Sequence, residues 1–178
     1  VVAAPYPYAN NIQWDAWFDY YEIAKWADRI SPMTYLDHGP WTEPGAITRF
    51  EDFKRRYMTL LKFVPRHKIL AGIGLFGCLW SEEMTAEQNL VELATWIAGR
   101  TKLLPIKDYQ SGQWTAVAND GKTWFAAGDT IGELLELVHG ERIRGIALWK
   151  LDDDDFSFWK KGKRINVYRP NFRLRKMG

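Results

Sequence analysis

The stretch Lys68-Ile-Leu-Ala-Gly-Ile-Gly-Leu-Phe-Gly-Cys-Leu-Trp80 decides the fold class of this chain. From Ile69 to Leu75 it contains no polar side chain. Strands that are buried on both faces, as in a parallel sheet covered by helices, have sequences of this kind. The stretch therefore predicts a central parallel strand at residues 68–75.

The same stretch contains Gly72-x-Gly74-x-x-Gly77, the glycine spacing of a dinucleotide-binding loop. Such a loop needs a helix that begins at the third glycine, so that the first N–H groups of the helix meet the pyrophosphate. Here the apolar residues Cys78-Leu79-Trp80 follow, and the next helix signal is the capping-box pattern Thr85-x-x-Gln88. We therefore predict that the strand ends in a loop that carries Trp80, and that the chain binds no dinucleotide.

Strand-like and helix-like segments alternate on both sides of this stretch. Such alternation predicts a parallel sheet with right-handed crossovers. Four such strands suit either an open doubly wound sheet or half of a (β/α)8 barrel, because a whole barrel needs about 250 residues and the chain has 178. The expected strands are residues 1–4, 29–35, 68–75 and 143–149, and the expected helices are residues 12–27, 50–63, 85–97 and 130–139. A hairpin is expected at residues 113–118 and 122–126, around the turn Asn119-Asp120-Gly121.

The composition is that of an ordinary globular domain, with 47% hydrophobic and 26% charged residues. A net charge of +2 gives no reason to expect nucleic acid as a partner. The single cysteine, Cys78, excludes an internal disulfide and a cysteine-based zinc site, and no run of apolar residues is long enough to cross a membrane. We expect no metal and no cofactor. The compartment is not fixed by these features, and an extracellular or cell-surface location is only an expectation.

Aromatic residues follow every expected parallel strand. In parallel α/β folds the carboxyl ends of the strands carry the ligand chemistry, and flat aromatic rings there suit a sugar-binding barrel. The alternative is that each of the 10 tryptophans is a core residue, and that Asp37 and His38 belong to a solvated turn. The residues concerned are Tyr6 after the first strand, Met33, Tyr35 and Asp37 after the second, Phe76 and Trp80 after the third, and Trp149 in the fourth.

The C-terminal part is strongly charged. The run Asp152–Asp155 lacks the spacing of a calcium loop, so we interpret it as a solvated helix cap, with Asp152 alone facing a cleft. Eight lysines and arginines between Lys160 and Lys176 form either a polyanion-binding tail or a solvated terminus. We therefore divide the chain into a domain at 1–155 and a basic extension at 156–178.

Four segments, in this order, resemble the C-terminal half of family 18 glycoside hydrolases, the chitinase-like (β/α)8 barrels. Lys68–Trp80 is similar to their seventh strand, which reads K-I-x-x-G-I-P-x-Y-G-x-x-W. Met33-Thr34-Tyr35 resembles the sixth-strand M-x-Y-D motif, Gly145–Trp149 followed by Leu151-Asp152 resembles the eighth strand, and residues 1–5 fit the fifth. The resemblance implies parallel (β/α) units that form strands five to eight of a barrel that is incomplete in this chain.

The resemblance also implies roles for individual residues. Trp149 would form the floor of the subsite that holds the N-acetylhexosamine, and Tyr35 would hydrogen-bond the N-acetyl group, whose oxygen is the nucleophile in that family. Asp37 is the second catalytic candidate. The implied partners are a β-linked N-acetylglucosamine glycan, of chitin or peptidoglycan type, and the N-terminal half of the barrel, from missing residues or another chain. The substrate-binding candidates are Tyr6, Met33, Phe76, Trp80, Trp149 and Asp152.

The chain departs from the family pattern at three places. The fourth-strand motif D-x-x-D-x-D-x-E, which supplies the general acid, is absent; we expect it upstream of Val1, in a longer protein. Leu36 occupies the place of the sixth-strand acid and Asp37 follows it, while Phe76 replaces the usual tyrosine. Two functions of the barrel therefore stay open: part of an active glycosidase, or a non-catalytic carbohydrate-binding or structural barrel. Polyanion binding through the basic segment is a third.

Overall fold

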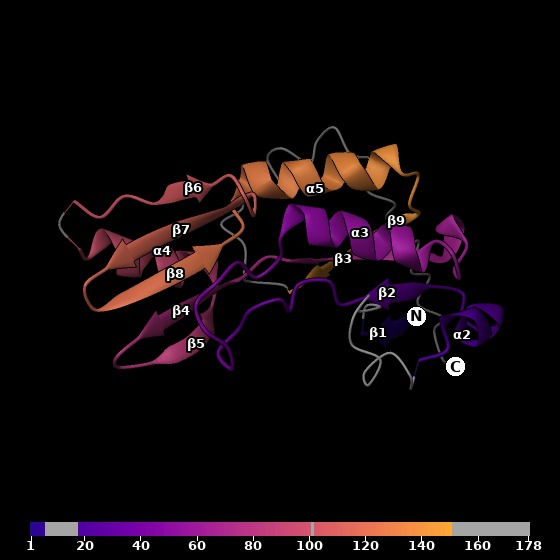
Figure 1. The fold of residues 1–178 in the computed structure, drawn as a ribbon, viewed down its shortest axis with the longest axis horizontal. Helices are drawn as coiled ribbons and strands as arrows, with labels where there is room; N and C mark the ends of the chain where they lie inside the picture. Colours follow the sequence, from indigo (N-terminus) through magenta and orange to yellow (C-terminus); the bar gives the residue numbers. More distant parts are fainter. Residues whose placement is uncertain (6–17, 101, 151–178) are drawn as a thin grey trace, which may run out of the picture.

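The computed structural model describes residues 1–5, 18–100 and 102–150. Four short strands, β1 (Val2–Ala4), β2 (Ile30–Pro32), β3 (Leu70–Gly74) and β9 (Gly145–Trp149), run parallel to one another. A separate antiparallel sheet lies at the other end of the molecule (Figure 1).

The parallel strands lie side by side in the order of the chain. β1 pairs with β2, and the register begins with Val2 opposite Ile30. β3 pairs with β9, and the register begins with Leu70 opposite Gly145. A single parallel bridge between Ile30 and Ile69 connects the two pairs. The predicted set of four adjacent parallel strands is thus confirmed. Within the described ranges the sheet does not close on itself, because β1 and β9 each have a strand neighbour on one side only.

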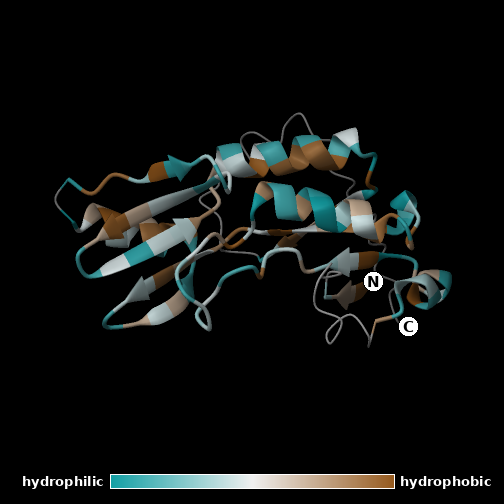
Figure 2. Cartoon of the chain, in the orientation of Figure 1, coloured by the Kyte–Doolittle hydropathy of each residue, from teal (hydrophilic) through white to brown (hydrophobic). Residues whose placement is uncertain are grey.

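Three helices accompany these strands: α2 (Tyr20–Trp26), α3 (Phe50–Leu60) and α5 (Gly128–Gly140). Apolar and polar residues alternate around α5 in Figure 2, as expected for a helix that buries one face. The buried sides of α3 and α5 pack against the strands and form the main core. Its most deeply buried side chains include Phe53, Tyr57, Leu60, Ile73 and Ile131.

A five-stranded antiparallel sheet is inserted between β3 and α5. Its strands are β4 (Gly77–Ser81), β5 (Thr85–Gln88), β6 (Ile106–Asp108), β7 (Gln113–Ala118) and β8 (Gly121–Phe125), in the spatial order β5-β4-β8-β7-β6. The helix α4 (Leu90–Ala98) packs on this sheet through Leu93, Leu79 and Phe125. The predicted hairpin is confirmed as β7 and β8, with Ala118 opposite Gly121.

Two local predictions were wrong in this insert. Residues 78–80 are not a loop but part of β4, whose side chains are buried because Leu79 packs against α4 and Cys78 and Trp80 pack in the cluster of Tyr35. Thr85 does not begin a helix: Thr85–Gln88 is β5, and pairing with β4 outweighs its local capping pattern. The helix begins one turn later, where Asn89 and Glu92 form a complete capping box.

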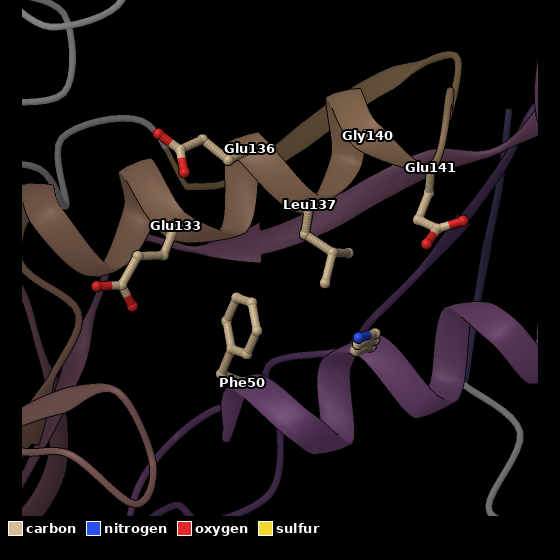
Figure 3. Close-up of a pocket in the computed structure, with 7 residues that line it drawn as sticks. Phe50, Glu133, Glu136, Leu137, Gly140 and Glu141 are labelled. Carbon is tan, nitrogen blue, oxygen red and sulfur yellow. The ribbon is translucent and has the colours of Figure 1, made fainter.

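A hollow of about 440 Å³ lies between α3 and α5 (Figure 3). It is lined by residues of these two helices and of the C-cap of α5, among them Phe50, Glu133, Glu136 and Leu137. Of the predicted site residues that the structure describes, none lines it. In the part of the chain that the structure describes, no helix is long and apolar enough to span a bilayer.

Candidate functional site

Three aromatic rings from three different parallel strands meet at the carboxyl ends of those strands. Tyr35 follows β2, Phe76 follows β3, and Trp149 is the last residue of β9. The rings of Tyr35 and Trp149 are stacked, with 14° between their planes and 6.4 Å between their centroids, and Phe76 meets Tyr35 edge-on at 6.1 Å. Tyr35 and Phe76 are buried, whereas Trp149 is 49% exposed, so the indole presents most of the accessible apolar surface of this trio.

The glycines of the Gly72-x-Gly74-x-x-Gly77 pattern make this arrangement possible. A Cβ atom on Gly72 would lie 2.2 Å from the Pro32 carbonyl oxygen, and one on Gly74 would lie 2.9 Å from both Tyr35 Cβ and the Phe76 ring. A Cβ on Gly77 would lie 2.4 Å from a methyl group of Leu93. All three positions thus need glycine for close packing. Gly77 begins a strand and not a helix, which removes the basis for a dinucleotide site.

A second group of side chains, from the inserted sheet, extends the aromatic cluster. Trp80 is buried, donates a hydrogen bond from Nε1 to the Thr42 carbonyl at 3.0 Å, and meets Trp124 edge-on at 6.3 Å. Met33 is half-buried against the same cluster. The loop between β2 and α3 is tied to the inserted sheet a second time, because the Ile47 N–H donates to Gln113 Oε1 at 2.8 Å.

Asp37, the second catalytic candidate, forms a buried ion pair. Its carboxylate pairs with the guanidinium of Arg56 and accepts a hydrogen bond from the Arg49 backbone N–H at 3.1 Å. The side chains of Asp37 and Arg56 are only 5% and 7% exposed. The structure thus gives Asp37 a partner on α3, and its catalytic role stays a prediction.

The two ionisable groups inside the aromatic cluster are held neutral at ordinary pH. Burial raises the pKa of the Tyr35 phenol, and the negative charge of Glu87 adds to the effect. Burial, again reinforced by Glu87, raises the pKa of the Cys78 thiol to about 12. Tyr35 can therefore exchange hydrogen bonds as a neutral phenol, but it is not available as a base.

Sequence reasoning missed several residues of this site. Glu87 lies opposite Cys78 in the pairing of β5 with β4, but residues 85–88 were interpreted as helix. The apolar run that continues through Trp80 was the available signal for β4. Arg56 gives no local signal, because its role depends on a partner in another element. Tyr6 and Asp152 lie outside the described residues. Among the described residues no group of three or more histidine, cysteine or acidic side chains could hold a metal ion.

These features define an α/β protein whose parallel strands bring aromatic side chains together at their carboxyl ends, the arrangement of ligand sites in (β/α) barrels. No family model matches the chain. It is similar to two proteins of Bacillus subtilis strain 168. The uncharacterized glycosylase YvbX is 29% identical over 161 residues, which cover 85% of this chain and 46% of YvbX. The putative sporulation-specific glycosylase YdhD is 24% identical over 161 residues, covering 84% of this chain and 38% of YdhD.

Solved structures show the same fold. A chitinase from Chromobacterium violaceum superposes with a TM-score of 0.81 at 21% identity, covering 89% of this chain and 52% of the chitinase. The spore cortex-lytic enzyme SleL of Bacillus cereus superposes with a TM-score of 0.78 at 18% identity, covering 89% of this chain and 39% of SleL. The resemblance to chitinase-like glycoside hydrolases that the strand motifs indicated is thus confirmed. The chain spans less than half the length of YvbX and YdhD and about half that of the chitinase.

Proposed function

We propose that this chain is the C-terminal half of a glycoside hydrolase-like (β/α)8 barrel that acts on β-linked N-acetylglucosamine glycans, such as chitin or peptidoglycan. The observation that carries the proposal is the stack of Tyr35 on a half-exposed Trp149 at the carboxyl ends of parallel strands. A flat indole with one accessible face suits the apolar face of a pyranose ring.

The open edges of the parallel sheet support the proposal of a half barrel. β1 and β9 lie at the two ends of the described ladder, and the residues of β9 are all partly exposed. An N-terminal half with four more parallel strands would pair with both edges, and it would come from further residues of the same protein or from another chain. We extend the proposal to the domain division, with the barrel half at 1–155 and a basic extension at 156–178.

In the proposed reaction this half binds the sugar and the other half supplies the acid. Trp149 would lie under the N-acetylhexosamine, and the neutral phenol of Tyr35 would hydrogen-bond its N-acetyl group. The N-acetyl oxygen attacks the anomeric carbon while a general acid from the N-terminal half protonates the leaving oxygen. Water then opens the resulting oxazolinium ion, so that the anomeric configuration is retained. Met33, Phe76 and Trp80 would shape the cleft.

A non-catalytic carbohydrate-binding barrel is the second candidate, and one observation favours it. Leu36 stands where the family motif has an acid, and its side chain is half-buried against the aromatic cluster. An apolar side chain at that place cannot orient or stabilise the N-acetyl group by charge or hydrogen bonding. A barrel with this residue would still be able to hold a glycan through Trp149.

The two candidates can be separated with protein made from the complete gene. Its binding to N-acetylglucosamine oligomers is measured by calorimetry, and its products from chitin oligomers and purified peptidoglycan by mass spectrometry. Binding with release of shorter oligomers is the result we expect. Binding without any cleavage would favour the carbohydrate-binding barrel, and absence of both would rule out the glycan proposal.

A further inference from the structure

A buried ion pair links the end of β2 to helix α3. Arg56 lies on the buried side of α3, and Asp37 lies two residues after Tyr35. Both side chains are more than nine-tenths buried. Charges as buried as these are costly unless each has its partner in good geometry, so the pair fixes the chain at Asp37 relative to α3.

The next residue of α3 holds the other side of Tyr35. The Tyr57 hydroxyl accepts a hydrogen bond from the Gly72 N–H at 2.8 Å and lies 3.3 Å from the Thr34 hydroxyl, which donates to the Gly72 carbonyl at 2.7 Å. Tyr57 is 1% exposed, and burial raises the pKa of its phenol, so the group stays neutral and keeps these bonds. Thr34 directly precedes Tyr35 in the chain.

These side-chain bonds add to the backbone bonds that hold the segment around Tyr35. β2 ends at Pro32, and a single parallel bridge joins Ile30 to Ile69, the residue before β3. Beyond Pro32, the Met33 N–H donates to the Ala4 carbonyl at 2.9 Å and the Asp37 N–H donates to the Ile47 carbonyl at 3.0 Å, so backbone bonds hold the segment before and after Tyr35. Arg56 and Tyr57, consecutive on α3, add side-chain contacts with Asp37 and Thr34, which lie on either side of Tyr35 in the chain.

We propose that Arg56 and Asp37 are positioning residues that hold Tyr35 in its stack against Trp149. Asp37 then acts through Tyr35 and takes no part in proton transfer. The inference deepens the proposed function, on which it rests for its ligand, an N-acetylglucosamine oligomer. The position of Tyr35 itself can be tested without any ligand.

The first test observes Tyr35 directly in the ligand-free protein. All tyrosines of the protein made from the complete gene are replaced by 3-fluorotyrosine, and the Tyr35 resonance is assigned in the ¹⁹F spectrum by its loss in Tyr35→Phe. Arg56→Met should shift or broaden this resonance. Arg55→Met is the matched control, because Arg55 is its neighbour on α3, is 62% exposed and pairs with Asp52. An unchanged Tyr35 signal in Arg56→Met would overturn the inference.

The second test is a double-mutant cycle in glycan binding. Arg56→Met should weaken oligomer binding by about tenfold when Tyr35 is present, and by less than about twofold in the Tyr35→Phe background, because the loss acts through the phenol hydroxyl. Arg55→Met should leave binding unchanged in both. An equal loss from Arg56→Met in both backgrounds would mean a general structural effect and contradict the proposal.

Two milder variants cover the case in which Arg56→Met does not fold. Arg56→Lys keeps the charge, and Asp37→Asn keeps the shape of its partner. Asp37→Asn should perturb the Tyr35 resonance and weaken binding only when Tyr35 is present, whereas Arg56→Lys should largely preserve both. If the unmodified protein binds no N-acetylglucosamine oligomer, the proposed function fails, and the ¹⁹F comparison alone decides the positioning role.

Discussion

The rings of Tyr35 and Trp149 stack on each other across an intervening strand. Tyr35 follows β2 and Trp149 ends β9, while β3 lies between them in the order of the sheet. The stack is possible because the positions of β3 beneath Tyr35 are Gly72 and Gly74, where a Cβ atom would lie 3.2 Å from the Tyr35 ring and 2.9 Å from its Cβ, respectively. The glycines of the pattern that resembles a phosphate-binding loop leave room here for the side chain of Tyr35.

Replacing Trp149 should affect glycan turnover more than stability. Trp149→Ala removes the proposed sugar platform, and we expect turnover of an N-acetylglucosamine oligomer to fall by about tenfold or more. The melting temperature should change little, because the indole is 49% exposed and contributes limited burial. Trp26→Ala is the control, since Trp26 lies on α2 and is 87% exposed. A variant that loses stability but retains its specific activity would assign Trp149 to the core.

A methyl group at Gly74 should destabilise the protein and disturb the site. In Gly74→Ala the new Cβ meets Tyr35 and Phe76 at 2.9 Å, so we expect a loss of about 1–3 kcal/mol in urea unfolding. Gly132→Ala is the matched control. Nothing lies within 4 Å of a Cβ at that position inside α5, and alanine there should stabilise by about 0.5–1 kcal/mol. Equal effects of the two substitutions would show that close packing at Gly74 is not what requires glycine.

The parallel strands could be predicted because burial on both faces leaves a continuous apolar run, as in residues 69–75. The hairpin of β7 and β8 could be predicted because Asn119-Asp120-Gly121 is a strong local turn signal. The strand β5 could not be predicted, because Thr85–Gln88 is half exposed and its strand conformation depends on pairing with β4. Its pattern resembles a helix start, and the true start uses Asn89 four residues later.

The arrangement of the candidate site was predictable only where position after a strand was enough. The meeting of Tyr35, Phe76 and Trp149 could be predicted in this way, because the carboxyl ends of parallel strands converge. The burial of Asp37 against Arg56 could not be predicted, since it depends on which face of α3 meets the end of β2. One residue along the chain reverses the direction of a side chain near a strand end, so the displaced acid could not be assigned a direction from sequence.

Cys78 should be unreactive in the native protein at neutral and mildly alkaline pH. The thiol is fully buried, lies 3.2 Å from the Ala86 carbonyl oxygen and has its pKa raised to about 12. An unfolded thiol loses its proton near pH 9, so the unfolded state binds fewer protons above that pH and stability should fall as pH rises from about 9 toward 12. Labelling with iodoacetamide at pH 8 should be slow in buffer and fast in urea. Rapid labelling of the native protein would contradict the buried position.

Lys107 should stabilise the junction between the inserted sheet and α5 in a pH-dependent way. Its ammonium group, on β6, lies 3.0 Å from Asp129 and 2.7 Å from Glu133, and Trp114 Nε1 donates to Asp129 at 2.9 Å. Partial burial raises the pKa of Asp129, but the hydrogen bonds from Trp114 and Lys107 outweigh it and the net pKa is lowered. The stability contributed by Asp129 is therefore present above its unfolded pKa of about 4 and is lost as pH falls through the folded value.

The variant Lys107→Met tests this junction because methionine keeps most of the apolar stem and removes the charge. We expect it to lower the free energy of unfolding by up to about 1 kcal/mol at pH 7, a small effect because Asp129 and Glu133 are 40% and 46% exposed and screened by solvent. Urea unfolding from pH 3 to pH 7 should show this difference shrinking below about pH 4, as the carboxylates are protonated in both proteins. Lys122→Met on β8, an exposed lysine, is the control and should show little effect at any pH. A difference between Lys107→Met and the unmodified protein that stays constant from pH 3 to pH 7 would mean that Lys107 acts through packing of its stem and not through its charge.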